Sequence, residues 1–381
     1  MTNKPNLSIL NISMASGGAE KVISLFLTEL VKDFNVTLFL FYNEKHFRIP
    51  KEVKTVTFSN GTPKVSSFRR ILDFILFTYM YNRLLHKNKI EYGISFLAFP
   101  NLINGIASIF NPNLKTIISE RGYPSDNTSS KLSLYISKLF YPLLYNRCDK
   151  LFSNSVYINK DLKENFGVKI PMRVIYNPIQ SPRDTIDSRN IIEDKEIFNL
   201  INVGSLNKRK NQFMIIKALS QLEAKYKLAI LGDGEAKSSL EKLILSNGLN
   251  QNVSLIGKVK NVNDFLIQND CFILSSNTEG FPNALLEAMA IGLPCISTNC
   301  LSGPLELLND NDSVNIAKGD FFKASYGILV NMNDDIGLAN ALCYLKSNPT
   351  ERKRYSELSI ERSKKYMLKN IYIEFRDFIT H

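Results

Sequence analysis

The chain of 381 residues is long enough for two domains of ordinary size, and its 44% hydrophobic and 22% charged residues are typical of a globular protein. The net charge of +11 is uneven, because residues 1–180 carry 23 Lys and Arg against 12 Asp and Glu, whereas residues 181–381 carry 24 of each. This basic half predicts an anionic partner, either an anionic membrane surface or a phosphorylated acceptor, although a basic surface kept for solubility is the alternative. We find no nucleic-acid-binding motif and expect no nucleic acid partner.

The sequence shows no signal for export or membrane insertion. Residues 1–7 lack the apolar core of a signal peptide, and the strongest apolar run, Phe74 to Tyr81, is shorter than the roughly 20 residues that span a bilayer. We therefore expect a cytoplasmic protein. Its five cysteines at irregular spacing, beside three histidines, predict buried free thiols rather than a zinc site or disulfides.

Residues 1–178 alternate short apolar runs with longer amphipathic ones. Strands are expected over 7–12, 36–41, 92–96, 116–119, 150–153 and 173–176, and helices over 19–33, 67–86 and 131–145. This βα alternation predicts a first domain with a parallel sheet covered on both faces.

The polar segment 179–196 predicts a linker, after which the alternation restarts in a second domain, residues 197–360. Strands are expected over 198–203, 227–231, 253–256, 271–274, 294–297 and 327–330, and helices over 212–222, 235–246, 262–267, 283–290, 305–308, 335–345 and 350–378. Residues 361–381 are expected to form a helix that packs back on the first domain. The fold class is thus α/β, with two Rossmann-like doubly wound domains that bind ligand in a cleft between them, beyond the carboxyl ends of the strands.

Residues 278–288 combine a loop, a helix start and two carboxylates with seven residues between them. Gly280 permits a tight turn, and Pro282 is tolerated in the first helical turn before Asn283. The free N–H groups of such a helix start suit an anionic or hydroxyl-rich ligand. Glu287 can accept hydrogen bonds from a vicinal diol such as ribose, and Glu279 can stabilise developing positive charge on a sugar ring, whereas two surface charges are the alternative.

Other candidate residues follow predicted strands. Gly17 and Gly18 precede a helix and allow backbone amides to approach a phosphate, or simply form a turn. Arg209 and Lys210 follow the first strand of the second domain and can neutralise a diphosphate, or belong to a solvated loop. Glu120 follows a strand of the first domain and can act as a base for an acceptor hydroxyl, or pair with Arg121.

Two further patterns do not support a cofactor or a metal ion. Asp310 and Asp312 have the spacing of a metal site but lie in a polar turn. Gly232 and Gly234 resemble the start of a dinucleotide fingerprint, but the third glycine and the later acidic residue are missing. A hydride-transfer enzyme is therefore not expected.

With these segments in order, the chain resembles a family 4 glycosyltransferase of the GT-B fold over nearly its whole length. The pair Glu279 and Glu287 matches the E-x7-E pattern of that family. Supporting segments are Gly17-Gly18, 174–178, 231–234, 253–257 and 292–297. The resemblance implies retaining transfer from a nucleotide sugar with neither a metal ion nor a cofactor, by front-face attack in which the leaving diphosphate helps to take the acceptor's proton.

The resemblance also assigns roles to residues. Glu287 would bind the ribose, Glu279 would lie near the donor sugar, and Lys210 would hold the diphosphate. The donor site as a whole would comprise Gly17, Gly18, Ser205, Arg209, Lys210, Gly257, Gly280, Phe281, Pro282, Asn283 and Glu287, with Glu306 near the diphosphate.

The chain departs from the family pattern at two positions. Ser205 stands where the family usually has Arg, and we hypothesise that Arg209 supplies the missing charge. Glu120 and Arg121, after Ser119, stand where many relatives have His. That variant resembles bacterial enzymes that build O-antigen or capsule from UDP-hexose or UDP-N-acetylhexosamine donors.

The sequence therefore predicts a hexosyltransferase that acts on a polyprenyl-diphosphate-linked saccharide at the inner face of the membrane. Its basic first domain would face the anionic lipids through Arg69, Arg70, Arg83, Lys87 and Lys89. A UDP-sugar epimerase of the same fold and a non-catalytic nucleotide-sugar-binding subunit, for which Ser205 is the support, are the alternatives.

Overall fold

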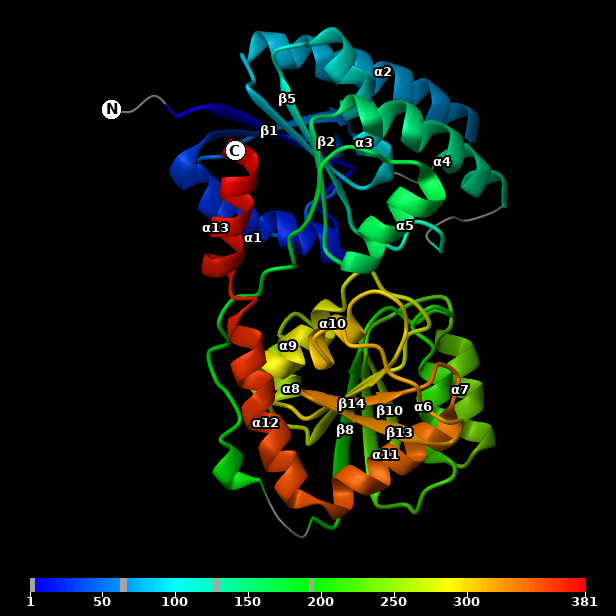
Figure 1. The fold of residues 1–381 in the computed structure, drawn as a ribbon. Coiled ribbons are helices and arrows are strands. Elements are labelled where there is room, and N and C mark those ends of the chain that lie inside the picture. The colour runs from blue at the N-terminus through cyan, green and yellow to red at the C-terminus, as the bar shows by residue number, and fades with distance from the viewer. Residues whose placement is uncertain (1–3, 62–66, 127–130, 192–194) are drawn as a thin grey trace. The chain divides into compact units, whose positions relative to one another are not determined.

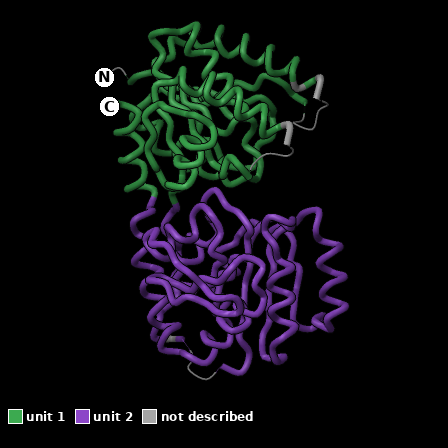
Figure 2. Tube along the Cα trace, turned by 45° about the vertical axis from the view of Figure 1, so that its right-hand side comes forward, with its two compact units in different colours: residues 1–178, 368–381 green, residues 179–367 purple. Residues whose placement is uncertain are grey.

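The computed structural model describes residues 4–61, 67–126, 131–191 and 195–381, and the chain forms two compact units. Unit 1 joins Met1–Pro178 with Leu368–His381, and unit 2 is Ile179–Met367 (Figure 2). The segment that we expected to be a linker, 179–196, is thus part of unit 2, where the Ile186 amide donates to the Ile291 carbonyl at 2.7 Å.

Unit 1 is built on a seven-stranded sheet of order β3-β2-β1-β4-β5-β6-β7 in which every pair is parallel. The inner strands are mostly buried and rich in apolar residues, whereas the edge strands β3 and β7 are partly exposed. They are β1 (Asn6–Asn11), β2 (Asn35–Tyr42), β3 (Lys54–Ser59), β4 (Tyr92–Phe96), β5 (Lys115–Glu120), β6 (Lys150–Ser153) and β7 (Met172–Val174).

Helices cover both faces of this sheet (Figure 1). One face carries α1 (Gly18–Asp33) and α13 (Leu368–Thr380), whose Phe26 and Phe375 rings stack with centroids 4.3 Å apart. The C-terminal helix therefore closes the core of unit 1. The other face carries α2 (Ser67–Lys87), α3 (Ala98–Phe110), α4 (Lys131–Leu144) with the short η1 (Tyr145–Arg147), and α5 (Val156–Phe166).

Unit 2 repeats this plan with the order β10-β9-β8-β11-β12-β14-β13, in which only β13 runs antiparallel to its neighbour. The strands are β8 (Phe198–Val203), β9 (Tyr226–Leu231), β10 (Val253–Gly257), β11 (Cys271–Leu274), β12 (Cys295–Thr298), β13 (Phe321–Ala324) and β14 (Gly327–Val330). The helices are η2 (Ser188–Asn190), α6 (Gln212–Leu219), α7 (Lys237–Ser246), α8 (Val262–Leu266), α9 (Asn283–Ile291), α10 (Pro304–Leu308), α11 (Asp335–Ser347) and α12 (Pro349–Lys364).

The predicted fold class, α/β with two Rossmann-like doubly wound domains, is confirmed. In each sheet the strand order reverses between the first and fourth strands of the unit, β1 and β4 in unit 1 and β8 and β11 in unit 2. Ligands of such sheets bind at this reversal, beyond the carboxyl ends of the strands. We therefore expect the ligand site of unit 2 at the loops after β8 and β11.

The structure also contains elements that the sequence did not predict: β3, α3, α5 and β13. Helix α3 contains Pro100, Asn104 and Gly105, which are poor helix formers, but tertiary contacts retain it. Gly105 allows close approach, since a Cβ there would lie 2.4 Å from the Leu144 carbonyl oxygen. The single helix expected over 350–378 is broken between α12 and α13.

The cysteines are free, as expected, and four are buried, but Cys343 is exposed, so the expectation of burial is wrong at that position. None of the helices in the described part of the chain combines the length and apolar character that a membrane span requires.

Candidate active site

Two loops meet at the strand reversal of unit 2. The loop after β8 carries Arg209 and Lys210, and the loop after β11 leads to Glu279. The Asn277 amide donates to the Arg209 carbonyl, and the Ser275 hydroxyl donates to the Lys210 carbonyl, both at 2.8 Å. These bonds hold the two cations next to the carboxylate-bearing loop.

Glu279 is the centre of a buried ion cluster. Its carboxylate is 4% exposed, accepts from Lys210 Nζ at 2.5 Å and from Ser276 Oγ at 2.6 Å, and lies 3.7 Å from Arg209 Nη1. Burial acts to raise the pKa of this carboxyl, but Lys210, Arg209 and Ser276 together outweigh burial and hold the pKa below its usual range. Glu279 therefore carries a fixed negative charge at neutral pH.

The aliphatic part of the Lys210 side chain lies against glycine backbone, where no side chain takes up the space. A Cβ at Gly204 would lie 3.5 Å from Lys210 Cδ, so the stem lies against this backbone. Gly232 has φ +141°, and a Cβ there would lie 1.9 Å from the Gly204 carbonyl oxygen. Only glycine lets the ends of β8 and β9 approach so closely.

The loop before α9 is held by the neighbouring segment at Ser302 and Gly303 rather than by the backbone of Gly280. Gly280 is not among the described glycines with positive φ, so it does not supply the left-handed backbone that only glycine adopts readily. The unusual backbone lies at Ser302 (φ +72°) and Gly303 (φ +103°), where a Cβ on Gly303 would lie 2.3 Å from Pro282 Cδ. The Ser302 hydroxyl donates to the Gly280 carbonyl at 2.5 Å, and Phe281 is buried with its ring centroid 5.8 Å from that of Tyr366.

Helix α9 starts at Asn283, directly after Pro282 at the N-cap. Most of the helix is buried, and its partly exposed residues are Asn283, Ala284 and Glu287. Asn283 and Glu287 are four residues apart and so share one face of the helix. Ser205 is exposed, and Gly257 has φ +85° with open space where a Cβ would stand. Among the predicted donor residues, Arg209 and Lys210 both contact Glu279.

In unit 1, the start of α1 contains a carboxylate of its own. Gly17 is the N-cap residue with extended backbone (φ −122°, ψ 165°), and a Cβ there would lie 2.0 Å from Glu20 Oε2. Burial raises the pKa of Glu20, although hydrogen bonds to its own backbone and to Asn11 oppose this. An acid at the third helical position, here Glu20, is a helix-start signal that is visible in the sequence. The side chain lies where a phosphate was expected next to Gly17 and Gly18.

A second buried glutamate lies at the end of β5. Glu120 is 1% exposed and accepts from the Tyr145 hydroxyl at 3.0 Å. Burial raises the pKa of its carboxyl to about 7, with smaller opposing effects of Tyr145 and Arg121. Tyr145 was missed from the sequence because its contact with Glu120 spans 25 residues.

The neighbouring Arg121 is also buried. Its Nη2 donates to Asn177 Oδ1 at 2.7 Å, and its guanidinium lies 5.6 Å and 5.7 Å from the ring centroids of Phe96 and Phe152. Its Nε and Nη1 have no hydrogen-bond partner among the described residues. Burial lowers the pKa of Arg121 to about 9. The guanidinium thus bonds to Asn177, while the Arg121 amide donates to Glu120 Oε1 at 3.4 Å.

Asp310, one of the two aspartates with the spacing of a metal site, takes part in an ion pair instead. Asp310 Oδ1 pairs with Arg362 Nη1 at 2.6 Å, and the described residues contain no group of three or more His, Cys, Asp or Glu suited to a metal ion.

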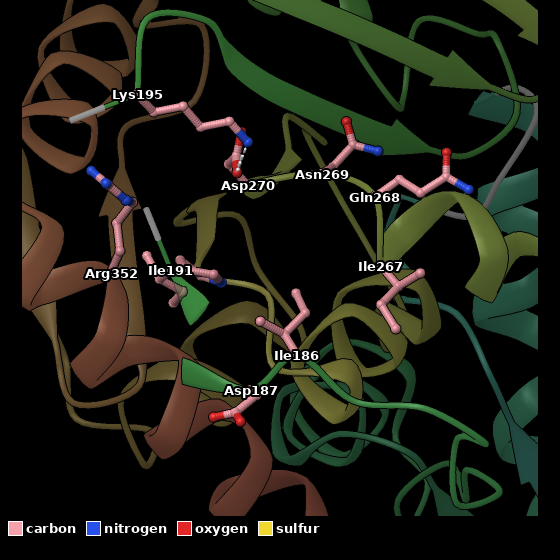
Figure 3. A pocket seen from close by; sticks show the side chains of 10 residues that line it. Ile186, Asp187, Ile191, Lys195, Ile267, Gln268, Asn269, Asp270 and Arg352 are labelled. Carbon is pink, nitrogen blue, oxygen red and sulfur yellow. Dashed lines mark hydrogen bonds and ion pairs between the residues drawn. The ribbon is translucent and has the colours of Figure 1, made fainter. Parts of the chain in front are cut away.

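A cavity of about 270 Å³ includes the Lys195–Asp270 ion pair (2.7 Å) and Arg352 (Figure 3). Because Asp270 directly precedes β11, the cavity lies at the opposite edge of the sheet from Glu279.

Solved structures share this fold. The Anabaena protein HepE in complex with UDP and glucose has a TM-score of 0.75 at 15% identity and covers 99% of both chains. The lipopolysaccharide outer core galactosyltransferase WaaB has a TM-score of 0.72 at 18% identity and covers 98% of both chains. The two doubly wound units thus have the GT-B architecture of glycosyltransferases.

Sequence comparisons name the family. The model for group 1 glycosyl transferases matches residues 183–362, and the model for Glycosyltransferase Family 4 matches residues 16–181. A glycosyltransferase of Methanocaldococcus jannaschii is 31% identical over 72% of this chain and 74% of its own length. The chain belongs to glycosyltransferase family 4.

One relative has a more specific name. It is the N-acetylgalactosamine-N,N'-diacetylbacillosaminyl-diphospho-undecaprenol 4-alpha-N-acetylgalactosaminyltransferase of Campylobacter jejuni, which is 29% identical over 95% of this chain and 99% of its own length.

Proposed function

We propose that this glycosyltransferase moves a hexose or N-acetylhexosamine from a UDP-sugar to a polyprenyl-diphosphate-linked saccharide, as a step in the assembly of a bacterial surface polysaccharide such as O-antigen or capsule. The transfer retains the anomeric configuration and uses neither a metal ion nor a cofactor. The protein works in the cytoplasm, at the inner face of the membrane. Support comes from the Campylobacter relative, whose name specifies an undecaprenyl-diphosphate-linked acceptor, and from the HepE complexes with UDP and UDP-glucose.

The observation that carries this proposal is the Lys210–Glu279 pair at the strand reversal of unit 2. A lysine with its stem against Gly204 and its ammonium on a buried carboxylate has little freedom, so it is preorganised to meet an incoming diphosphate. In the free protein, Glu279 neutralises the Lys210 ammonium. When the donor binds, its diphosphate becomes a second anion beside the same ammonium. Glu279 stays ionised and stabilises positive charge that develops on the sugar.

Arg209 supplies the second cation of the donor site. Its side chain is 49% exposed and reaches within 3.7 Å of Glu279, so it lies in the cluster while it keeps room to turn toward a ligand. It replaces the arginine that relatives carry at the position of Ser205. Glu287, on the partly exposed face of α9, binds the ribose, and the backbone N–H groups of Gly280 and Phe281 donate to hydroxyls of the sugar.

The acceptor side is the Glu120 cluster of unit 1. A carboxyl with a pKa of about 7 is half ionised near neutral pH, which suits a group that accepts a proton from a hydroxyl. The leaving diphosphate shares this task in the front-face mechanism. Arg121 has two nitrogens, Nε and Nη1, without a partner among the described residues, and their N–H groups can meet an acceptor oxygen.

Thermal-shift titrations test the donor assignment. UDP and UDP-sugars should raise the melting temperature, since a ligand that binds only the folded protein stabilises it, whereas GDP- and ADP-sugars should not. Glu287→Gln should weaken the effect of UDP, with Glu241→Gln, at an exposed position of α7, as the matched control in the same unit. No UDP response in the wild type would refute the proposal.

Product analysis tests the reaction itself. Incubation with a UDP-sugar and a short-chain polyprenyl-diphosphate saccharide should give a product whose new linkage has the anomeric configuration of the donor by NMR, and EDTA should not reduce the rate. An inverted linkage would refute retention. Conversion of the UDP-sugar in the absence of any acceptor would instead identify an epimerase.

A further inference from the structure

Unit 1 exposes two apolar helix faces. On α2 the side chains of Ile71, Leu72, Ile75, Leu76 and Tyr79 are 45% to 64% exposed, and on α4 those of Tyr135, Ile136, Leu139, Phe140 and Leu143 are 38% to 71% exposed. Both sets have the spacing i, i+1, i+4, i+5, i+8, which is one continuous face of a helix. Apolar side chains gathered in this way mark an interaction surface, unlike single exposed ones.

The two faces belong to one side of unit 1. Helices α2 and α4 both pack against α3, on the face of the sheet away from α1 and α13 (Figure 1). Their opposite faces supply the core, through Phe77 and Tyr81 of α2 and Tyr141 of α4. The exposed apolar residues are therefore surplus to the packing of this unit.

The charges on these helices are complementary to an anionic surface. The only acidic residue of α2 is Asp73, which is buried and paired with Arg69 at 2.9 Å, and α4 has none. Exposed cations accompany the apolar faces, among them Arg83 and Lys87 of α2 and Lys138 of α4. The side chain of Arg70, which was also expected on this surface, lies outside the described residues.

This combination points to one occupant. We infer that the exposed faces of α2 and α4 form a membrane-docking surface, on which the ten apolar side chains insert into the interfacial layer of an anionic bilayer and the basic side chains contact lipid phosphates. Lysine and arginine stems with apolar neighbours are typical of helices that lie in the plane of such an interface, and tyrosine is favoured there. A second copy of this chain would place like charges opposite one another.

The surface also explains how a lipid-linked acceptor reaches the enzyme, a point that rests on the proposed function. In a βα unit the helix runs back along the sheet, so the first turns of α2 and α4 lie at the edge where the strands end. Glu120 ends β5 at that same edge. A bilayer bound to α2 and α4 therefore presents its headgroup layer on the side of unit 1 that carries the candidate base.

The test is a vesicle sedimentation assay with the full chain. The probes are vesicles of phosphatidylglycerol and phosphatidylcholine in equal parts, and vesicles of phosphatidylcholine alone, both without any glycolipid. The docking variant carries Ile75→Gln, Tyr79→Gln, Leu139→Gln and Leu143→Gln, which keep helix propensity and alter exposed positions only. The matched control carries Leu245→Gln and Ile336→Gln, which are 69% and 48% exposed on unit 2.

The wild type and the control should bind the anionic vesicles, and the docking variant should bind them at least about tenfold more weakly, since binding grows with buried apolar area and with anionic attraction. A charge variant, Arg83→Glu with Lys138→Glu, should lose binding to anionic vesicles in a salt-dependent manner. Undiminished binding of the docking variant would overturn the inference. So would a change from dimer to monomer in light scattering with no change in vesicle binding, which would assign the surface to a second copy.

The outcome is separable from that of the transfer assay. With a short-chain acceptor in detergent, the docking variant should retain the wild-type rate, because it alters no residue of the candidate site. Vesicle binding without any transfer would refute the proposed function and leave the docking surface intact.

Discussion

The two units each bury a glutamate at the carboxyl edge of a parallel sheet, but they treat its charge in opposite ways. In unit 2, Glu279 lies on Lys210 and beside Arg209, and these cations hold its pKa below the usual range despite burial. In unit 1, Glu120 is held by a tyrosine hydroxyl, and burial raises its pKa to about 7. A fixed charge suits binding and electrostatic stabilisation, whereas a titrating carboxyl suits proton transfer.

The same contrast has opposite consequences for stability. The Glu279 pKa is depressed in the folded state, so its stabilising effect is present above the unfolded pKa near 4.5 and is lost as the pH falls. The Glu120 pKa is raised from 4.5 to about 7, so its effect is fully present below 4.5 and is lost as the pH rises through 7. Unit 2 is thus the acid-sensitive partner in this comparison and unit 1 the alkali-sensitive one.

The largest effect is expected from Lys210→Met. Turnover should fall by about a thousandfold, because the diphosphate loses its preorganised cation. Removal of one partner from a buried ion pair should also cost about 3–5 kcal/mol of unfolding free energy. The measurements are steady-state kinetics and chemical denaturation.

A double variant separates the two effects of that substitution. Lys210→Met with Glu279→Gln removes both charges and should regain stability without regaining activity. Full activity in Lys210→Met would show that the pair is structural.

Glu120→Gln should reduce turnover by about a hundredfold while the affinity for UDP is unchanged, if Glu120 accepts the proton of the acceptor. The wild-type rate should rise with pH through about 7, and the variant should lose that dependence. The variant should also be more stable than the wild type at pH 8 by on the order of 3 kcal/mol, with little difference at pH 4. An unchanged pH profile would remove Glu120 from the chemistry.

Arg209→Ala should weaken the binding of UDP-sugar by about tenfold and leave the pH profile unchanged, because a half-exposed cation contributes less than a buried one. Isothermal titration with UDP measures this change. Lys208→Ala, next in the chain and exposed, is the control. Equal donor affinity in Arg209→Ala and wild type would show that nothing replaces the arginine absent at Ser205.

The smallest effect is expected from Tyr145→Phe, which removes one hydrogen bond from Glu120. The tyrosine lowers the pKa of this carboxyl, so its loss should move the rising limb of the pH–rate profile to higher pH. The rate at pH 7 should fall by only a few-fold, and stability by about 1 kcal/mol. Tyr81→Phe, which removes a buried tyrosine hydrogen bond to Ser8 (3.0 Å) in the same unit, is the matched control and should leave the profile in place.

Much of the candidate site could be anticipated because the carboxyl ends of parallel strands lie at the same edge of their sheet. The segments with Arg209 and Lys210 and with Glu279 each follow an apolar run, and the family pattern linked them. Glu20 and Tyr145 were missed for different reasons. Glu20 had a local signal, an acid at the third position of a helix, whereas Tyr145 meets Glu120 only through the packing of α4 and η1 on the sheet.

The sequence by itself determined the alternation of strands and helices, hence two doubly wound units, since periodicity and turn residues act over a few neighbours. It also determined the family, through a glutamate pattern held within eleven residues. Only the tertiary structure decided the charge state of each carboxylate, because burial and partners far along the chain set a pKa. Only the tertiary structure, too, decided that the apolar faces of α2 and α4 stay exposed, since the same spacing would serve equally well in a core.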